Sequence, residues 1–186
     1  MIPVVMIREN LEGITDVPVP DGYRLRTFAP GDEASWARVQ CAAGGFRGEA
    51  PALEHFSMEF GPHLAEMTGR CLLLESDRDG IVGSTTAWRD PGFRGADHGR
   101  VHWVAVIPAH QGRGLGRLLV TRALVVLRRW HERAYLTTQT SSWIAIHLYL
   151  SLGFVPFLAA PEQAEGWDLL RREAPHPLLG PPPYAR

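Results

Sequence analysis

The segment Gln111–Gly116, which reads QGRGLG, contains the residue types best suited to hold an anionic ligand. Its three glycines let backbone N–H groups approach an anion closely, because glycine has no side chain to stand in the way. Arg113 and Arg117 add guanidinium groups whose planar geometry matches phosphate oxygens. The segment therefore predicts a phosphate-binding loop that would hold a diphosphate well.

The segments on either side of this loop support that interpretation. The run RVHWVAVI before it is β-branched and aromatic and ends at Pro108, which is typical of a strand. From Leu115 to Trp130 apolar residues recur at helical spacing, which predicts a long amphipathic helix. A helix that begins at the loop directs its unpaired N–H groups and positive dipole end toward the same place. A glycine-rich turn that only begins a helix is the competing interpretation.

Two familiar nucleotide loops do not match this segment. The glycines are not followed by Lys and then Ser or Thr, and the G-x-G-x-x-G spacing is not met. The sequence therefore argues against ATP and NAD as the ligand.

The rest of the chain predicts further strands and helices in a mixed order. Period-two alternation, β-branched runs and turn residues indicate strands, and 3.6-residue periodicity with glycine or proline terminators indicates helices. The expected strands are YRLRTF from Tyr23, CLLLES and IVGSTTAW around a turn at 77–80, AYLTT, FVPFLA and GWDLLRR, and the expected helices cover Asp32–Ala43, Pro51–Phe60 and WIAIHLYLSL up to Gly153. This order predicts an α+β fold around a largely mixed sheet.

Length and composition favour one domain. With 186 residues and 45% hydrophobic residues, the chain can bury a core of its own. We predict an N-terminal extension over 1–22, a catalytic domain over 23–174 and a Pro-rich tail over 175–186. Because 19 Lys and Arg face 20 Asp and Glu, we expect neither a nucleic-acid partner nor a membrane partner.

The N-terminus and the cysteines bear on location. MIPVVMIREN lacks the pattern of a signal peptide, and apolar stretches stay shorter than the roughly 20 residues needed to cross a bilayer. Cys41 and Cys71 do not suggest a disulfide framework. We therefore expect a cytoplasmic protein, and we predict no metal site.

The stretch VAVIPAHQGRGLGRLLV resembles the acetyl-coenzyme A signature of the GNAT superfamily, [Q/R]-x-x-G-x-[G/A]. Gln111, Gly114 and Gly116 match it, and AIHLYLSLGF is similar to the family's later helix and strand, so the resemblance spans about residues 100–157. It implies a mixed, mostly antiparallel central sheet flanked by helices, with a splayed strand pair that binds acetyl-CoA.

The resemblance also implies which residues contact acetyl-CoA. Loop amides would bind the pyrophosphate, and the preceding strand would pair with pantetheine. Ser142 lies where many relatives carry an Asn that touches the cofactor; it could hydrogen-bond there or only cap the helix. The expected contacts are Val104, Ala105, Val106, Gln111, Gly112, Arg113, Gly114, Leu115, Gly116, Arg117 and Ser142.

Two side chains are candidates for proton transfer. Tyr149 falls where the family places a tyrosine near the coenzyme sulfur, so it is the candidate general acid, and a core tyrosine is the alternative. His102 matches an imidazole position of arylalkylamine acetyltransferases and is the candidate base, with an ordinary polar strand residue as the alternative. Val104 or Val106 would supply a backbone N–H to the thioester carbonyl.

The acceptor side is less defined. Phe56, Glu59, Phe60 and Trp88 are candidate substrate contacts, and Glu59 could attract an ammonium group, although each also suits packing. Thr137 stands where some protein N-terminal acetyltransferases carry an acidic residue, which weighs against their mechanism.

The predicted function is acetyl-CoA-dependent acetylation of the primary amine of a small molecule by direct attack on the thioester. A protein or peptide N-acetyltransferase and a noncatalytic coenzyme A sensor remain open as alternatives. A homodimer is also open, with apolar residues such as Phe157 or Leu170 as candidate contacts.

Overall fold

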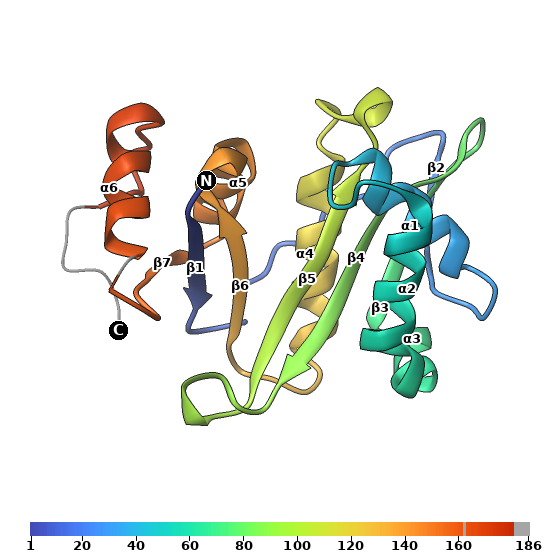
Figure 1. Cartoon of the computed structure of the whole chain (residues 1–186), viewed down its shortest axis with the longest axis horizontal. Helices are drawn as coiled ribbons and strands as arrows, with labels where there is room; N and C mark the ends of the chain where they lie inside the picture. The colour runs from blue at the N-terminus through green and yellow to red at the C-terminus, as the bar shows by residue number, and fades with distance from the viewer. Residues whose placement is uncertain (162, 181–186) are drawn as a thin grey trace.

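The computed structural model describes residues 1–161 and 163–180, which fold around one seven-stranded sheet (Figure 1). The strands are β1 (Pro3–Arg8), β2 (Tyr23–Thr27), β3 (Cys71–Ser76), β4 (Gly80–Asp90), β5 (His98–Val106), β6 (Ala134–Gln139) and β7 (Val155–Phe157). The helices are α1 (Glu33–Ala42), α2 (Glu49–Phe60), α3 (Leu64–Arg70), α4 (Leu115–Leu127), α5 (Trp143–Ser151) and α6 (Gln163–Glu173).

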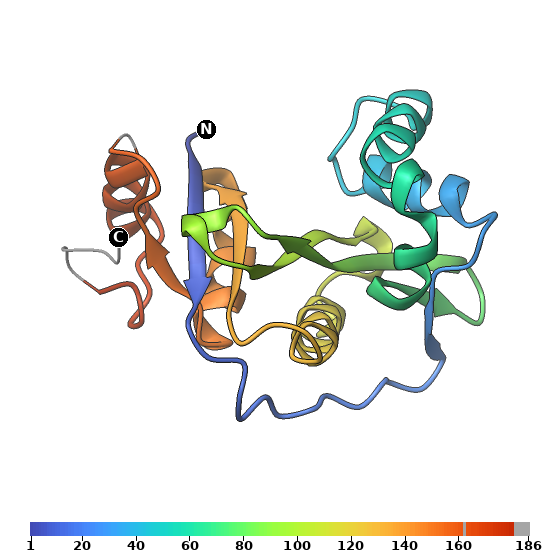
Figure 2. The same ribbon diagram turned by 90° about the horizontal axis from the view of Figure 1, so that it is seen from below.

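The sheet is mixed and mostly antiparallel, as predicted. Its strand order is β2-β3-β4-β5-β6-β1-β7, and only the β5–β6 pair is parallel. The helices α1, α2 and α3 cover one face of the half that contains β2 to β5, and α4 covers the opposite face (Figures 1 and 2). The α+β fold class is therefore confirmed.

Strand β3 shows how the two faces divide the core. Leu73 packs in the cluster formed with α1 and α2, whereas Leu72 and Leu74 pack with residues of α4. Because successive side chains of a strand point to opposite faces, three leucines in a row fit a strand that is covered on both sides. The run CLLLES is apolar without alternation for this reason.

Strand β1 is a difference from the sequence prediction, which placed residues 1–22 in an extension. Pro3–Arg8 lies inside the sheet, antiparallel to β6 on one side and to β7 on the other. Val4 and Met6 are buried in the main core, and Val5 and Ile7 are buried on the other face. A strand covered on both faces has no alternation, which is why its pattern was missed.

Residues 9–22 connect β1 to β2 along the α4 side of the molecule (Figure 2). Arg122 of α4 holds this connection through Asp16, 3.1 Å away, and the Val17 carbonyl, 3.2 Å away. The segment is therefore anchored to the domain.

The predicted last strand, GWDLLRR, is wrong. It lies in α6, where Trp167 and Leu170 are buried three residues apart, a helical spacing that outweighs their β preference. Gly166 lets α6 approach β1, since a Cβ there would come within 2.9 Å of the Val4 side chain.

The two residues suggested as dimer contacts are covered by the chain's own packing. Leu170 is 2% exposed and Phe157 is 4% exposed, so neither offers a pairing surface. In the predicted tail, Leu179 is buried in the main core, while residues 181–186 lie outside the described part of the chain.

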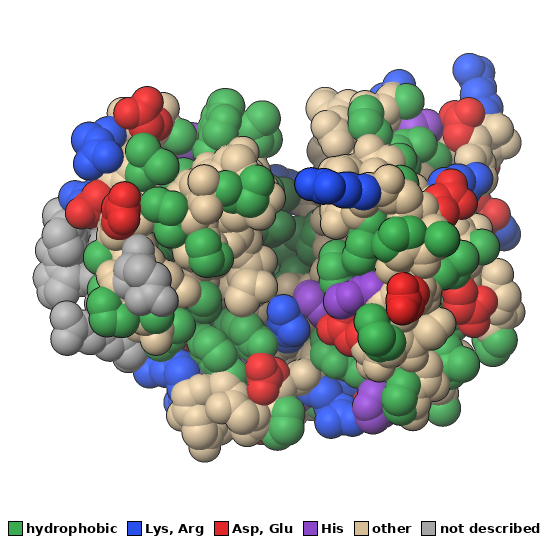
Figure 3. Space-filling model, in the orientation of Figure 1, with side chains coloured by type: hydrophobic (Ala, Val, Ile, Leu, Met, Phe, Trp, Pro, Cys, Tyr) green, Lys and Arg blue, Asp and Glu red, His purple; other side chains and the backbone are tan. Residues whose placement is uncertain are grey.

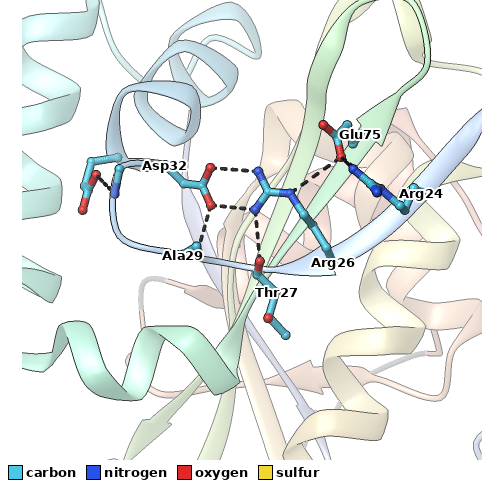
Figure 4. A network of polar contacts seen from close by, with 8 residues as sticks. Arg24, Arg26, Thr27, Ala29, Asp32 and Glu75 are labelled. Atoms are coloured by element: carbon cyan, nitrogen blue, oxygen red, sulfur yellow. Dashed lines mark hydrogen bonds and ion pairs between the residues drawn. The ribbon is translucent and has the colours of Figure 1, made fainter.

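A polar network fixes the start of α1 relative to β2 (Figure 4). Arg26 makes a two-pronged contact with Asp32, at 2.6 and 2.8 Å, and Asp32 also accepts the Ala29 N–H at 2.8 Å. Glu75 lies on the other side of Arg26 and bonds Arg24 at 2.6 Å. The paired guanidinium lowers the pKa of Asp32, which keeps this carboxylate charged at the helix N-terminus.

No helix in residues 1–161 or 163–180 is both long and apolar enough to cross a bilayer.

Candidate active site

The parallel strands β5 and β6 pair only at one end. Gly99 pairs with Ala134 and Arg100 with Tyr135, and beyond these residues the strands diverge (Figure 1). The predicted splay of this strand pair is confirmed.

A bulge in β5 lies along the diverging part. Ser84 of β4 faces Ala105, while Thr86 faces His102, so one β4 residue opposes both Trp103 and Val104. Trp103 has a φ of 50°, which is uncommon for a non-glycine residue. A bulge re-aims side chains, and this one turns His102 and Trp103 toward the same partner on α2.

A buried amide holds the bulge in place. Gln40 of α1 donates from Nε2 to the Trp103 carbonyl at 2.8 Å and to the Ser84 hydroxyl at 2.9 Å. Because a trans peptide directs its C=O and N–H to opposite sides, the N–H of Val104 points away from Gln40. Gln40 therefore sets the direction of this N–H group.

The loop Gln111–Gly116 has a backbone shaped for an anion. Gly112 and Gly114 have φ of 75° and 76°, and Gly114 is the N-cap residue directly before α4. Apart from the adjacent residues in the chain, no heavy atom of the described residues lies within 4 Å of where a Cβ would stand at either glycine. The loop thus presents open backbone at a helix N-terminus, where unpaired N–H groups favour phosphate.

Side chains of the loop are held by nearby groups. Gln111 donates to the Val106 carbonyl at 2.9 Å, Arg113 donates to the Tyr23 hydroxyl at 3.1 Å, and Arg117 donates to Ser151 at 2.7 Å. Leu115 is buried under the loop. Both arginines remain exposed, so their charge lies beside the open backbone.

Glu59 of α2 is the centre of a polar cluster on the other face of β5. Its Oε1 accepts from His102 Nε2 at 2.7 Å, and its Oε2 accepts from Trp103 Nε1 at 2.8 Å. His55, one helical turn earlier, lies 3.0 Å from Oε2 through its Nε2. The carboxylate is therefore occupied by three ring N–H groups.

These contacts determine the charge states. Burial of Glu59 opposes ionisation, but the hydrogen bonds from His102, Trp103 and His55 outweigh it and lower the pKa of Glu59 to about 2. Burial lowers the pKa of His102 below its usual value of 6.5, although Glu59 acts in the opposite direction. His102 is therefore neutral near pH 7.

The same contacts determine the tautomer of His102. A carboxylate acceptor at Nε2 requires the proton to be on Nε2, which leaves the lone pair on Nδ1. Among the described residues, Nδ1 has no hydrogen-bond partner. His102 thus presents an available proton acceptor.

A hollow of about 410 Å³ lies beside this cluster. In Figure 3, histidine side chains gather with an acidic and a basic group where the visible face is hollowed between its two halves. The side chains that line it come from α2 and β5: His55, Met58, Glu59, Arg100, His102 and Trp103.

Tyr149 of α5 lies on the opposite side of β5 from His102. It is 8% exposed and packs in the core cluster that Val101 and Val104 also contact. Burial raises the pKa of Tyr149 to about 12, and its hydroxyl has no hydrogen-bond partner in the described part of the chain. The hydroxyl is therefore protonated near neutral pH.

The remaining candidate substrate contacts and Ser142 do not line the hollow. Phe56, Phe60 and Trp88 are buried and pack against one another or against Trp36, so they shape the core rather than the site. Ser142 occupies the cap position of α5, but its side chain makes no cap hydrogen bond.

Sequence reasoning missed His55 and Arg100 as residues of the site. The residue spacing could have indicated both. His55 is four residues before Glu59 on a helix, and Arg100 is two residues before His102 on a strand, so each pair shares a face.

Comparison with known proteins finds relatives of similar sequence. Mycothiol acetyltransferase of Thermomonospora curvata is 36% identical over an alignment of 151 residues, with coverage of 77% of this chain and 48% of that protein. Mycothiol acetyltransferase of Nocardia farcinica is 33% identical over 159 residues, with coverage of 77% and 48%. The chain spans about half the length of the curated relatives it matches.

Solved structures show the same fold. A GCN5-related N-acetyltransferase from Sphaerobacter thermophilus superposes with a TM-score of 0.64 at 26% identity, covering 83% of this chain and 48% of that one. A tandem GNAT protein from the clavulanic acid biosynthesis pathway superposes with a TM-score of 0.59 at 19% identity, with coverage of 83% and 50%. The acetyltransferase (GNAT) family model matches residues 37–154, and the chain therefore belongs to this family.

Proposed function

We propose that this protein is an acetyl-CoA-dependent N-acetyltransferase that acts on the primary amine of a small molecule. The observation that carries the proposal is the arrangement around β5. An anion-binding loop lies at one end of the strand, the strand diverges from β6, and the His102–Glu59 pair faces a hollow on one side. Cofactor and acceptor can therefore meet across the bulge.

The residues present fit acetyl-CoA. The open backbone of Gly112 and Gly114 at the start of α4 suits a pyrophosphate, and Arg113 and Arg117 add positive charge. The edge of β5 from Val104 to Val106, which β6 does not cover, can pair with the amide groups of pantetheine. Bound there, acetyl-CoA would supply an acetyl group activated as a thioester.

Each step of the transfer has a candidate group. His102 Nδ1 accepts the proton that the amine must lose, so that the nitrogen forms its bond to the acetyl carbon as a neutral nucleophile. The Val104 N–H, directed by Gln40, donates to the carbonyl oxygen as negative charge builds on it. As the carbon–sulfur bond breaks, the Tyr149 hydroxyl donates its proton to the sulfur.

Glu59 has a different role from the one expected. Its carboxylate is occupied by three N–H groups and does not offer a free site for an ammonium ion. It holds His102 in the tautomer that leaves Nδ1 available, and acts as a positioning residue.

A small acceptor is supported by the hollow and by the relatives. About 410 Å³ suits a small ligand, and the named relatives are mycothiol acetyltransferases. The thiol-release assay described next distinguishes this proposal from a peptide acetyltransferase and from a noncatalytic coenzyme A sensor.

The test is thiol release from acetyl-CoA, measured with amines, amino acids, amino sugars and peptides. We expect turnover with a small amine that falls by at least about tenfold in Tyr149→Phe, a loss of about 1.4 kcal/mol of transition-state stabilisation. Preference for peptides would favour the peptide enzyme. Tight coenzyme A binding without thiol release on any acceptor would favour the sensor.

A further inference from the structure

Arg100 lies at the point where β5 and β6 begin to diverge. It is the last β5 residue paired with β6, opposite Tyr135, and its side chain lines the hollow beside His102. Its Nη2 is 3.4 Å from the Thr137 hydroxyl of β6, and its guanidinium lies 5.7 Å from the centre of the Tyr135 ring. The guanidinium therefore sits at the base of the gap, on the acceptor side.

This cation forms no ion pair with the described residues, and Asp90 is the carboxylate whose charge interacts with it. Its side chain is half-buried, and its Nε is buried without a hydrogen bond. The two nearby carboxylates are used elsewhere: Glu59 accepts from three rings, and Asp90 accepts from Tyr135 at 2.6 Å and from the Gly92 N–H at 3.0 Å. A buried N–H without an acceptor is costly, and a ligand that supplies an anion beside Arg100 would satisfy both this Nε and the unpaired charge.

The position of Arg100 relative to His102 restricts that ligand. The two residues are two apart on one strand, so their side chains extend from the same face and border the same hollow. In an α-amino acid the amine nitrogen and the carboxylate carbon are about 2.5 Å apart, as covalent geometry dictates. An amine at His102 Nδ1 would thus keep its carboxylate within the same hollow, which Arg100 also lines.

We propose that the acceptor carries a carboxylate next to its amine, as an amino acid does, and that Arg100 binds this carboxylate. The proposal rests on the proposed function for its reaction, but the binding of a carboxylate can be measured without turnover. Trp103 and Met58 border the same hollow and provide apolar surface for the rest of the acceptor.

The experiment is isothermal titration of the whole chain, saturated with coenzyme A, with matched pairs of products. The probes are N-acetylglycine, N-acetylleucine and N-acetylphenylalanine, each compared with its carboxamide. We expect at least one carboxylate to bind about tenfold or more tightly than its carboxamide, because a charged hydrogen-bonded pair is lost in the amide. Arg100→Gln should remove the difference, and Arg100→Lys should retain part of it.

The control variant is Arg129→Gln, which removes an exposed arginine that does not line the hollow and should preserve the preference. Coenzyme A affinity and melting temperature establish that Arg100→Gln is folded. Equal binding of carboxylate and carboxamide in all three pairs, or a preference that survives Arg100→Gln, would overturn the proposal.

Thiol release separates the two proposals. Carboxylate preference without turnover of any amine would leave the Arg100 site standing and refute the enzyme. Equal turnover of amino acids and of the matching amines without a carboxylate would leave the enzyme standing and refute the role of Arg100.

Discussion

The two ends of the site on β5 are built in different ways. The loop that follows β5 is made of backbone from one short segment, Gln111–Arg117, whose glycines determine its shape. The acceptor side is made of side chains, and Glu59 is 43 residues from His102 and 44 from Trp103. A site made of local backbone can be found from a motif, whereas a site made of distant side chains depends on how the sheet and helices pack.

Replacement of His102 tests the acceptor side most severely. His102→Ala removes the proposed proton acceptor while leaving the loop intact, so we expect kcat to fall by about 10²- to 10⁴-fold. Coenzyme A affinity should stay unchanged. Thiol-release kinetics and titration with coenzyme A measure the two quantities, and His63→Ala, on a partly exposed histidine paired with Glu66, is the matched control. An unchanged kcat would reduce His102 to a packing residue.

Replacement of Gly114 tests the loop. Gly114→Val places a β-branched residue at a φ of 76°, so the loop must strain or change shape. We expect coenzyme A affinity to fall by about 10- to 100-fold, with the His102–Glu59 pair undisturbed. Gly69→Val is the control, because Gly69 has an ordinary φ and open space around its Cα. Equal affinity in the two variants would contradict the proposed phosphate loop.

Removal of the Tyr149 hydroxyl tests the residue on the opposite side of β5. Tyr149→Phe keeps the ring in the core and removes the proposed proton donor, so we expect kcat to fall by about tenfold with little change in melting temperature. The measurement is kcat across pH 6 to 9 together with a thermal melt. If kcat is unaffected throughout, Tyr149 is only a packing residue.

The same contrast explains what the sequence could predict. The loop, β5, α4 and α5 were predicted because their signals are local: glycines, a proline stop and helical periodicity. Strand β1 was missed because it is covered on both faces and shows no alternation. GWDLLRR was assigned to a strand although Trp167 and Leu170 have helical spacing.

The acceptor side could be predicted only as separate residues. Glu59 and His102 were both candidates, yet their contact depends on α2 lying over β5 and on the bulge that turns His102 and Trp103 to one side. The spacing of Arg100 from His102 could place both on one face of a strand, but its position where the β5–β6 pairing ends is evident only from the structure.

Glu59 offers a subtler test of how the acceptor side works. Glu59→Gln keeps an acceptor for His102 Nε2 but removes the charge that favours protonated His102, so the pKa of His102 should fall further. A weaker base lowers kcat, and we expect less than a tenfold decrease because His102 itself is retained. The acidic limb of kcat/KM should move to lower pH. A limb that stays in place would show that His102 is not the titrating group.

Acid stability tests the charge of Glu59 without any measurement of catalysis. Its pKa is about 2 in the folded protein against an ordinary value of 4.5, so the folded state favours the charged form. This contribution is fully present above about pH 4.5 and is lost as the pH falls through about 2. Asp32, Glu66, Glu75 and Asp90 also have lowered pKa values, so the wild-type protein loses stability in acid for several reasons.

The part due to Glu59 is the difference in the free energy of unfolding between wild type and Glu59→Gln, on the order of 2 kcal/mol near neutral pH. Denaturant titrations at pH 7, 4.5 and 3 should show this difference shrinking as the pH falls. The wild type loses the charge of Glu59 in acid, whereas Glu59→Gln has no carboxylate at position 59 to protonate. A difference that stays constant with pH would mean that packing, and not the charge of Glu59, holds His102 and Trp103 together.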